Sequence, residues 1–129
     1  SRLMEETNQE PVLGRPDSTP TTQIDTFSVE GPVELVHFRS SELTAVCPVT
    51  NQPDFYTIDI SYSPKSICIE TKSLKLFLRT FEGVGIFAEH LAPQIASHLG
   101  EAVQVPVKVI LEQQIRGGIV TTVTSVSHN

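Results

Sequence analysis

Cys47 and Asp54 stand at the two ends of one short loop, and together they could carry covalent chemistry. Thr50, Asn51 and Pro53 between them are residues that form turns. A thiolate is a strong nucleophile, and a nearby carboxylate can pass protons to the group that the sulfur attacks. A lone cysteine is nevertheless more often a small core residue, and an aspartate before a strand is usually a turn residue. The loop predicts a nucleophile with a proton-transferring partner if other segments support that chemistry.

A second candidate site lies in residues 70–77, where Lys72 and Lys75 fall at the start of an expected helix. The ordinary interpretation is a helix capped by Thr71 or Ser73 with solvated lysines. Cations at a helix N-terminus, however, oppose the helix dipole, which favours anions there. They make better sense if an anionic ligand binds between the lysines and the free N–H groups. The segment therefore predicts a phosphate site.

A third candidate is Glu89, which stands beside the apolar stripe of another expected helix. Such a glutamate is normally just a solvated side chain. A partly buried carboxylate can also accept two parallel N–H donors from a guanine-like edge, in the geometry that makes carboxylate–guanidinium pairs strong. Glu89 is thus a candidate for binding a purine-like ligand.

The composition limits the kinds of molecule that this protein is expected to bind. The chain has nine basic and fifteen acidic residues, for a net charge of −6. A stable nucleic-acid complex usually needs a basic surface. The two cysteines and four scattered histidines form no recognisable metal set, so no metal is predicted. Both cysteines are expected to be free thiols in a reducing compartment. No apolar run is long enough to span a bilayer and no secretory segment opens the chain, so a cytoplasmic protein without a membrane partner is expected.

The elements that must position these residues follow from hydrophobic periodicity. Residues 1–29 show none and are predicted to be a flexible N-terminal arm, leaving residues 30–129 as a single domain. Within that domain the patterns predict two helices, at 73–81 and 86–99, the second ended by Gly100. Strands are predicted at 33–39, 55–63, 103–111 and 119–126.

This order, strand-strand-helix-helix-strand-strand, predicts an α+β fold with a four-stranded antiparallel sheet and both helices on one face. Four strands leave two open edges, which are a liability unless another chain pairs with them. A homo-oligomer is the expected remedy.

The three candidate segments together resemble the 7-cyano-7-deazaguanine reductase family of queuosine biosynthesis, over about residues 35–123. The family carries Cys-Pro-x-Thr-x-Gln-Pro-Asp, found here at residues 47–54. It carries a Glu-Ser-Lys-Ser-Leu-Lys type of motif associated with NADPH, which here reads Glu-Thr-Lys-Ser-Leu-Lys at residues 70–75. It also carries Arg-Gly-Gly-Ile before the last strand, here at residues 116–119.

The resemblance implies a tunnelling fold that assembles into a multi-subunit barrel with sites between subunits. It also implies reduction of the nitrile of 7-cyano-7-deazaguanine to an aminomethyl group by NADPH, through a thioimide on Cys47 and with protons from Asp54. The residues implied in substrate binding are Ile69, Glu70, Thr71, Ala88 and Glu89. The residues implied in cofactor binding are Lys72, Ser73, Lys75 and Arg116.

One position departs from the family pattern: Ala88 stands where the family usually has a histidine before Glu89. Two alternatives stay open, the second of them because of Ala88. One is an amidine-forming relative that acts on a tRNA-borne nitrile, although that branch lacks the NADPH motif retained here. The other is a protein that binds deazapurine without reducing it, against which the retention of Cys47 and Asp54 weighs.

Overall fold

The computed structural model describes residues 10–129, and residues 1–9 lie outside the described part. The helical elements are α2 (Thr71–Leu78), the short 3-10 helix η1 (Arg79–Phe81) and α3 (Ala88–Val103). The strands are β1 (Thr26–Ser28), β2 (Val36–Val46), β3 (Pro53–Tyr62), β4 (Ile67–Ile69), β5 (Lys108–Arg116) and β6 (Ile119–Val126). None of the helices in this part combines the length and apolar character that spanning a membrane requires.

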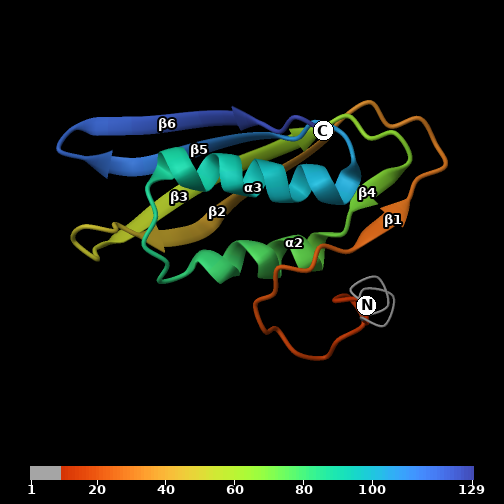
Figure 1. The fold of residues 1–129 in the computed structure, drawn as a ribbon, viewed down its shortest axis with the longest axis horizontal. Helices are drawn as coiled ribbons and strands as arrows, with labels where there is room; N and C mark the ends of the chain where they lie inside the picture. The colour runs from red at the N-terminus through yellow and green to blue at the C-terminus, as the bar shows by residue number, and fades with distance from the viewer. Residues whose placement is uncertain (1–9) are drawn as a thin grey trace.

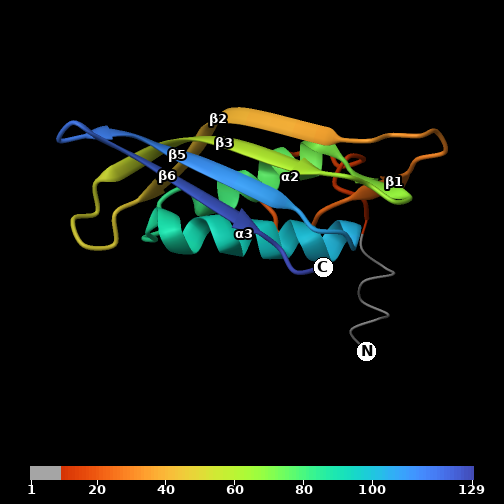
Figure 2. The ribbon, with the colours of Figure 1, turned by 90° about the horizontal axis from the view of Figure 1, so that it is seen from above.

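The main sheet has the order β2-β3-β5-β6, with every neighbouring pair antiparallel. Both helices cover one face of this sheet, as Figure 2 shows. The core lies between the sheet and the helices. Alternate residues of β3 and β5 point toward the helices, and the apolar stripe of α3 packs toward the sheet. The largest fully buried side chains include Ile58, Ile60, Leu91, Ile95, Leu99 and Leu111. The predicted α+β architecture, with both helices on one face, is confirmed.

A second, two-stranded sheet of β1 and β4 was not predicted, and it changes the description of the arm. β1 lies within residues 1–29, where no regular structure was expected, and Val12 is fully buried. Asp25 donates its backbone N–H to the Ser73 hydroxyl at 2.9 Å, so the segment is bonded to the start of α2. Figure 1 shows it running beside that helix. The prediction of a flexible arm is therefore wrong for residues 10–29, which pack on their own domain.

The end of α3 also differs from the prediction. Gly100 lies inside this helix rather than ending it. A Cβ there would come within 2.4 Å of the Ser127 hydroxyl, so glycine is required by packing against the C-terminal segment. The helix instead ends at Gln104, whose φ of 59° is left-handed. Val103 is therefore helical, and the strand predicted from residue 103 begins at Lys108.

Candidate active site

Cys47 follows directly on β2, in a loop that the backbone closes tightly. Val46 pairs with Pro53 across the hairpin, and the Cys47 N–H donates to the Gln52 carbonyl at 2.8 Å. The Cys47 carbonyl accepts from the N–H of Asn51, which adopts a left-handed φ of 59°. β2 extends well beyond the strand predicted at 33–39, and this extension fixes the cysteine at the end of a paired strand.

The Cys47 thiol is half-buried and lies among hydrogen-bond donors. Hydrogen bonds from the Thr50 hydroxyl, and from the backbone N–H groups of Thr50 and Val49, lower the pKa of Cys47, although burial and the charge of Asp54 act in the opposite direction. A lowered pKa increases the thiolate fraction near neutral pH, and the thiolate is the nucleophile. Cys68 is buried in β4. The loop can therefore activate one of the two thiols.

Asp54 is the second residue of β3, and its carboxylate is held from the neighbouring strand β5. Arg116 Nη2 lies 2.6 Å from Asp54 Oδ1, and Gln113 Nε2 donates to the same oxygen at 2.9 Å. Arg116 also donates to the Gln52 side chain at 3.2 Å and to the Pro53 carbonyl. Asp54 is only 4% exposed, so these contacts fix its orientation. Arg116, expected to bind the cofactor, contacts the candidate catalytic carboxylate in this structure.

The start of α3 lies next to the Cys47 loop. Val46 donates its N–H to the Val84 carbonyl at 2.9 Å, and its own carbonyl accepts from the Ile86 N–H at 3.1 Å. These bonds tether the segment that leads into Ala88 and Glu89. Ala88 is buried. Glu89 is exposed, whereas its proposed role in the sequence analysis called for a partly buried carboxylate. The structure thus brings Glu89 to the same end of the sheet as the loop.

Tyr56 is a residue of this region that the sequence analysis did not single out. Its hydroxyl oxygen is buried and has no hydrogen-bond partner among residues 10–129. Burial raises the pKa of Tyr56 to about 12, and the negative charges of Asp54 and Glu89 add to the effect. Its position two residues after Asp54, on the same face of β3, is the sequence signal that could have identified it.

The start of α2 is organised differently from the prediction. Glu70, not Thr71 or Ser73, is the N-cap, and its carboxylate accepts from the N–H groups of Lys72 at 2.7 Å and Ser73 at 2.8 Å. Lys72 Nζ donates to the Arg15 carbonyl at 2.6 Å. Ser73 is fully buried. In this chain Glu70 and Ser73 therefore support the helix start, and the N–H groups expected to face a phosphate already have a partner.

The candidate residues form two sets at opposite ends of the main sheet. Asp54 lies near the start of β3, and Tyr62 ends that strand eight residues later, about 26 Å away at the usual rise. The Tyr62 hydroxyl accepts from the Ile69 N–H at 2.8 Å, so Ile69 and Glu70 lie at the far end. In Figure 1 the β2–β3 loop and the start of α2 are correspondingly far apart. One small ligand cannot touch both sets within a single chain.

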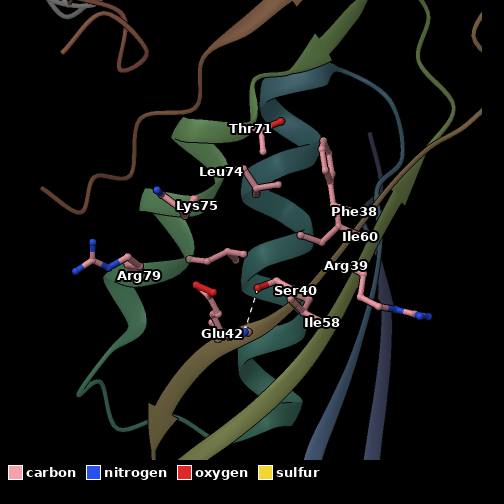
Figure 3. Close-up of a pocket in the computed structure, with 12 residues that line it drawn as sticks. Phe38, Arg39, Ser40, Glu42, Ile58, Ile60, Thr71, Leu74, Lys75 and Arg79 are labelled. Atoms are coloured by element: carbon pink, nitrogen blue, oxygen red, sulfur yellow. Dashed lines mark hydrogen bonds between the residues drawn. The ribbon is translucent and has the colours of Figure 1, made fainter. Parts of the chain in front are cut away.

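A cavity of about 230 Å³ opens between α2 and the β2–β3 pair, as Figure 3 shows. Its floor is apolar, formed by side chains that include Ile58, Ile60 and Leu74. Lys75 and Arg79 follow one another along the helical side. From β2 come Glu42, a carboxylate, and Arg39, whose guanidinium pairs with Asp59 and points away from α2. An apolar floor beside the cations of Lys75 and Arg79 suits an aromatic ring that is linked to phosphate.

These features define a class: α+β proteins with an activated cysteine and a clamped carboxylate at one end of an antiparallel sheet. The family of QueF-like proteins matches residues 53–129, and the chain belongs to this family. An enzyme from Frankia casuarinae named NADPH-dependent 7-cyano-7-deazaguanine reductase is 40% identical over 114 residues, which cover 88% of this chain and 91% of that one. A protein of the same name from Chlorobium luteolum is 49% identical over 99 residues, 75% of this chain and 81% of its own.

A solved structure supports the fold. The apo form of an archaeosine synthase described as QueF-Like superposes with a TM-score of 0.69, over 75% of this chain and 96% of that one. At 22% sequence identity this similarity supports the architecture alone.

Proposed function

We propose that this chain is an NADPH-dependent 7-cyano-7-deazaguanine reductase, which converts the nitrile to an aminomethyl group in queuosine biosynthesis. The observation that carries the proposal is the hydrogen-bonded Cys47 thiol beside the clamped Asp54 carboxylate, in a chain whose relatives bear that name. A nitrile is a poor hydride acceptor, and covalent addition of a thiolate divides the difficult reduction into easier steps.

In the proposed first step, Cys47 Sγ adds to the nitrile carbon. The S–C bond forms, one C≡N π bond becomes a lone pair on nitrogen, and Asp54 hands that nitrogen the proton taken from the thiol. Reduction from nitrile to amine then takes up two hydrides and two protons, and NADPH supplies the hydrides when it is bound. Between the two hydride transfers the C–S bond breaks, which releases the Cys47 thiol and leaves an imine to accept the second hydride.

The cavity beside α2 fits part of such a cofactor. Lys75 is exposed at its rim, and Lys72 lies one turn earlier with a single backbone acceptor, so we propose both for the phosphates. Arg79 adds positive charge at the same cavity, whereas the Arg39 guanidinium pairs with Asp59 and points away from α2. Ser73 is buried and Arg116 is bound to Asp54, which leaves these two without a direct role toward the cofactor in our proposal.

We further propose that the complete site lies between subunits of a homo-oligomer, in the manner of a barrel. Glu89 would bind the guanine-like edge beside Cys47, and a neighbouring subunit would supply Ile69, Glu70 and Thr71. The separation of about 26 Å along β3 supports this arrangement, as do the open edges of the sheet at β2 and β6. The acidic net charge supports a small-molecule substrate without stable nucleic-acid binding, and the free thiols support a cytoplasmic location.

Intact-mass spectrometry tests the chemistry directly. Protein mixed with 7-cyano-7-deazaguanine in the absence of NADPH should gain the mass of one nitrile per chain, and added NADPH should then be oxidised. Cys47→Ala should abolish both signals. Cys68→Ala is the matched control and should keep them, because that thiol is buried in a strand. An adduct that survives in Cys47→Ala contradicts the nucleophile, and an adduct without NADPH oxidation contradicts the reductase.

Mixed oligomers test the shared site. Co-expression of Cys47→Ala subunits with subunits carrying both Lys72→Ala and Lys75→Ala yields four combinations at each interface. If one subunit supplies the cysteine and its neighbour the lysines, about one quarter of the sites should be intact and active. If both sets act within one chain, no site holds both sets. NADPH oxidation measured well below the raised KM should then not exceed that of the double lysine variant alone.

A further inference from the structure

Two buried side-chain polar atoms in residues 10–129 have no hydrogen-bond partner, and both lie at the Cys47 end of the sheet. They are the Tyr56 hydroxyl oxygen and Arg116 Nε. Buried phenols usually find a partner, because an unpaired hydroxyl in the interior costs free energy. When native structures tolerate such groups, the position often has a role beyond packing. The orphan Tyr56 hydroxyl therefore requires an explanation.

The residues around the Tyr56 hydroxyl are those that the proposed reaction uses. Tyr56 follows Asp54 by two residues on the same face of β3 and pairs in register with Gln113, whose side chain donates to Asp54. The charges of Asp54, Glu89 and Cys47 all act on its phenol, so the hydroxyl lies within electrostatic range of each. Tyr56 is 2% exposed and belongs to the same buried cluster as Ala88, the first residue of α3.

The hydroxyl also remains a donor under working conditions. Burial raises the pKa of Tyr56 to about 12, with Asp54 and Glu89 next in importance, so the phenol keeps its proton throughout the neutral range. The other groups nearby are less suited to constant donation. Asp54 Oδ1 already accepts from Arg116 and Gln113, and Ala88, buried at the start of α3, bears no polar side-chain atom.

We propose that the Tyr56 hydroxyl is a catalytic group that donates a hydrogen bond to the nitrogen of the nitrile as Cys47 adds to its carbon. This inference rests on the proposed function. The bond would stabilise the negative charge that develops on nitrogen before Asp54 delivers the proton, and Tyr56 itself neither gains nor loses a proton over the cycle. A fixed donor aimed at developing charge, in a site that excludes water, is the arrangement of an oxyanion hole.

The test is Tyr56→Phe, which removes the hydroxyl and keeps the ring. Loss of a single donor of this type typically slows the step by about 10²-fold, so adduct formation with 7-cyano-7-deazaguanine should slow by that order in stopped-flow or quenched mass measurements. Thermal stability should be unchanged or higher, because no hydrogen bond is lost within the protein. Tyr62→Phe calibrates the stability measurement. It loses the bond from the Ile69 N–H, so its unfolding midpoint should fall by roughly 3–5 °C.

The outcomes separate the two proposals. A Tyr56→Phe protein that is as stable as the natural chain but slow to form the adduct supports the donor. If the natural chain forms the adduct and Tyr56→Phe forms it equally fast, the donor is refuted and the proposed function stands. If the natural chain forms no adduct, the proposed function fails and the donor fails with it.

Discussion

Replacing Arg116 with methionine should affect both stability and chemistry, because the guanidinium holds the carboxylate next to the candidate nucleophile. The substitution keeps an unbranched side chain but removes the charge 2.6 Å from Asp54 Oδ1 and the donors to Gln52 and Pro53. Asp54 would keep Gln113 as its donor at 2.9 Å. The resemblance implied a cofactor role for Arg116, so the variant also distinguishes two functions for one residue.

The magnitude follows from the burial of the pair. Removing one partner of a fully buried ion pair costs about 3–5 kcal/mol, and an exposed pair is worth about 0–1 kcal/mol. The Asp54 side chain is 6% exposed and that of Arg116 is 35% exposed, so the pair falls between these limits. We expect a loss of about 2–3 kcal/mol, which lowers the unfolding midpoint by roughly 6–15 °C in a chain of this size.

The assay that separates the two roles is adduct formation without NADPH. If Arg116 orients Asp54, adduct formation should slow at least about tenfold, a fraction of what general acid–base assistance contributes. Arg116→Lys should recover part of the loss, because an ammonium can pair with the carboxylate but cannot bridge three acceptors. Arg15→Met is the control, since among residues 10–129 the Arg15 side chain donates to two neutral acceptors, the Glu10 carbonyl and the Gln23 amide oxygen. Normal stability and adduct formation in Arg116→Met, with a raised KM for NADPH, would refute this reasoning and restore the cofactor role.

Three further predictions follow from the site and the fold. Thr50→Val removes the main cause of the lowered Cys47 pKa, so the pH profile of alkylation by iodoacetamide should move to higher pH. Joint replacement of Lys72 and Lys75 by alanine should raise the KM for NADPH at least about tenfold, since charge-assisted contacts contribute roughly 1.5–3 kcal/mol each, and adduct formation should survive. Gly100→Ala should lower the free energy of unfolding by about 1–3 kcal/mol, because the new Cβ meets the C-terminal segment.

Each of these has a control and a contrary outcome. Thr57→Val removes a hydroxyl from β3 outside the loop and should leave the pH profile of alkylation unchanged. If Thr50→Val also leaves this profile unchanged, the backbone N–H donors alone are enough to lower the pKa of Cys47. Lys65→Ala lies outside the cavity and should leave the KM for NADPH unchanged. If the double lysine variant loses adduct formation as much as NADPH oxidation, the two lysines support the fold. Gly31 has open space around it, so Gly31→Ala should be nearly neutral in the urea unfolding that measures the effect at Gly100.

Regular periodicity predicted the central elements well. The alternation through Ile58 and Ile60 identified the buried face of β3, and the spacing of Leu91 and Ile95 identified the helix that covers it. Such patterns are local, and one buried face is enough to produce them. The three-residue strands β1 and β4 are too short to show any period, and their pairing joins segments about forty residues apart. For that reason the arm was assigned no structure.

Contacts with distant parts of the chain limit what the sequence predicts at single residues. Gly100 resembled a helix stop, yet its lack of a side chain serves packing against Ser127. The resemblance implied a cofactor role for Arg116, and no local pattern reports its contact with Asp54, which lies 62 positions earlier. The same limitation applies to Tyr56, because its unpartnered buried hydroxyl and the charges near it become evident only in the folded chain.

The residues between the candidate nucleophile and its carboxylate form a unit in which most positions have a physical role. The hydroxyl of Thr50 polarises the Cys47 sulfur, and Asn51 adopts the left-handed conformation that a short amide side chain tolerates. Gln52 closes the loop with its carbonyl and accepts from the arginine of β5 with its side chain, and Pro53 offers that arginine a second acceptor. Because Gln52 contacts the Cys47 backbone with its carbonyl and Arg116 with its side chain, a change at Gln52 should alter the setting of the sulfur and the orientation of the carboxylate together. This coupling explains why the segment is informative as a whole, although its cysteine alone is not.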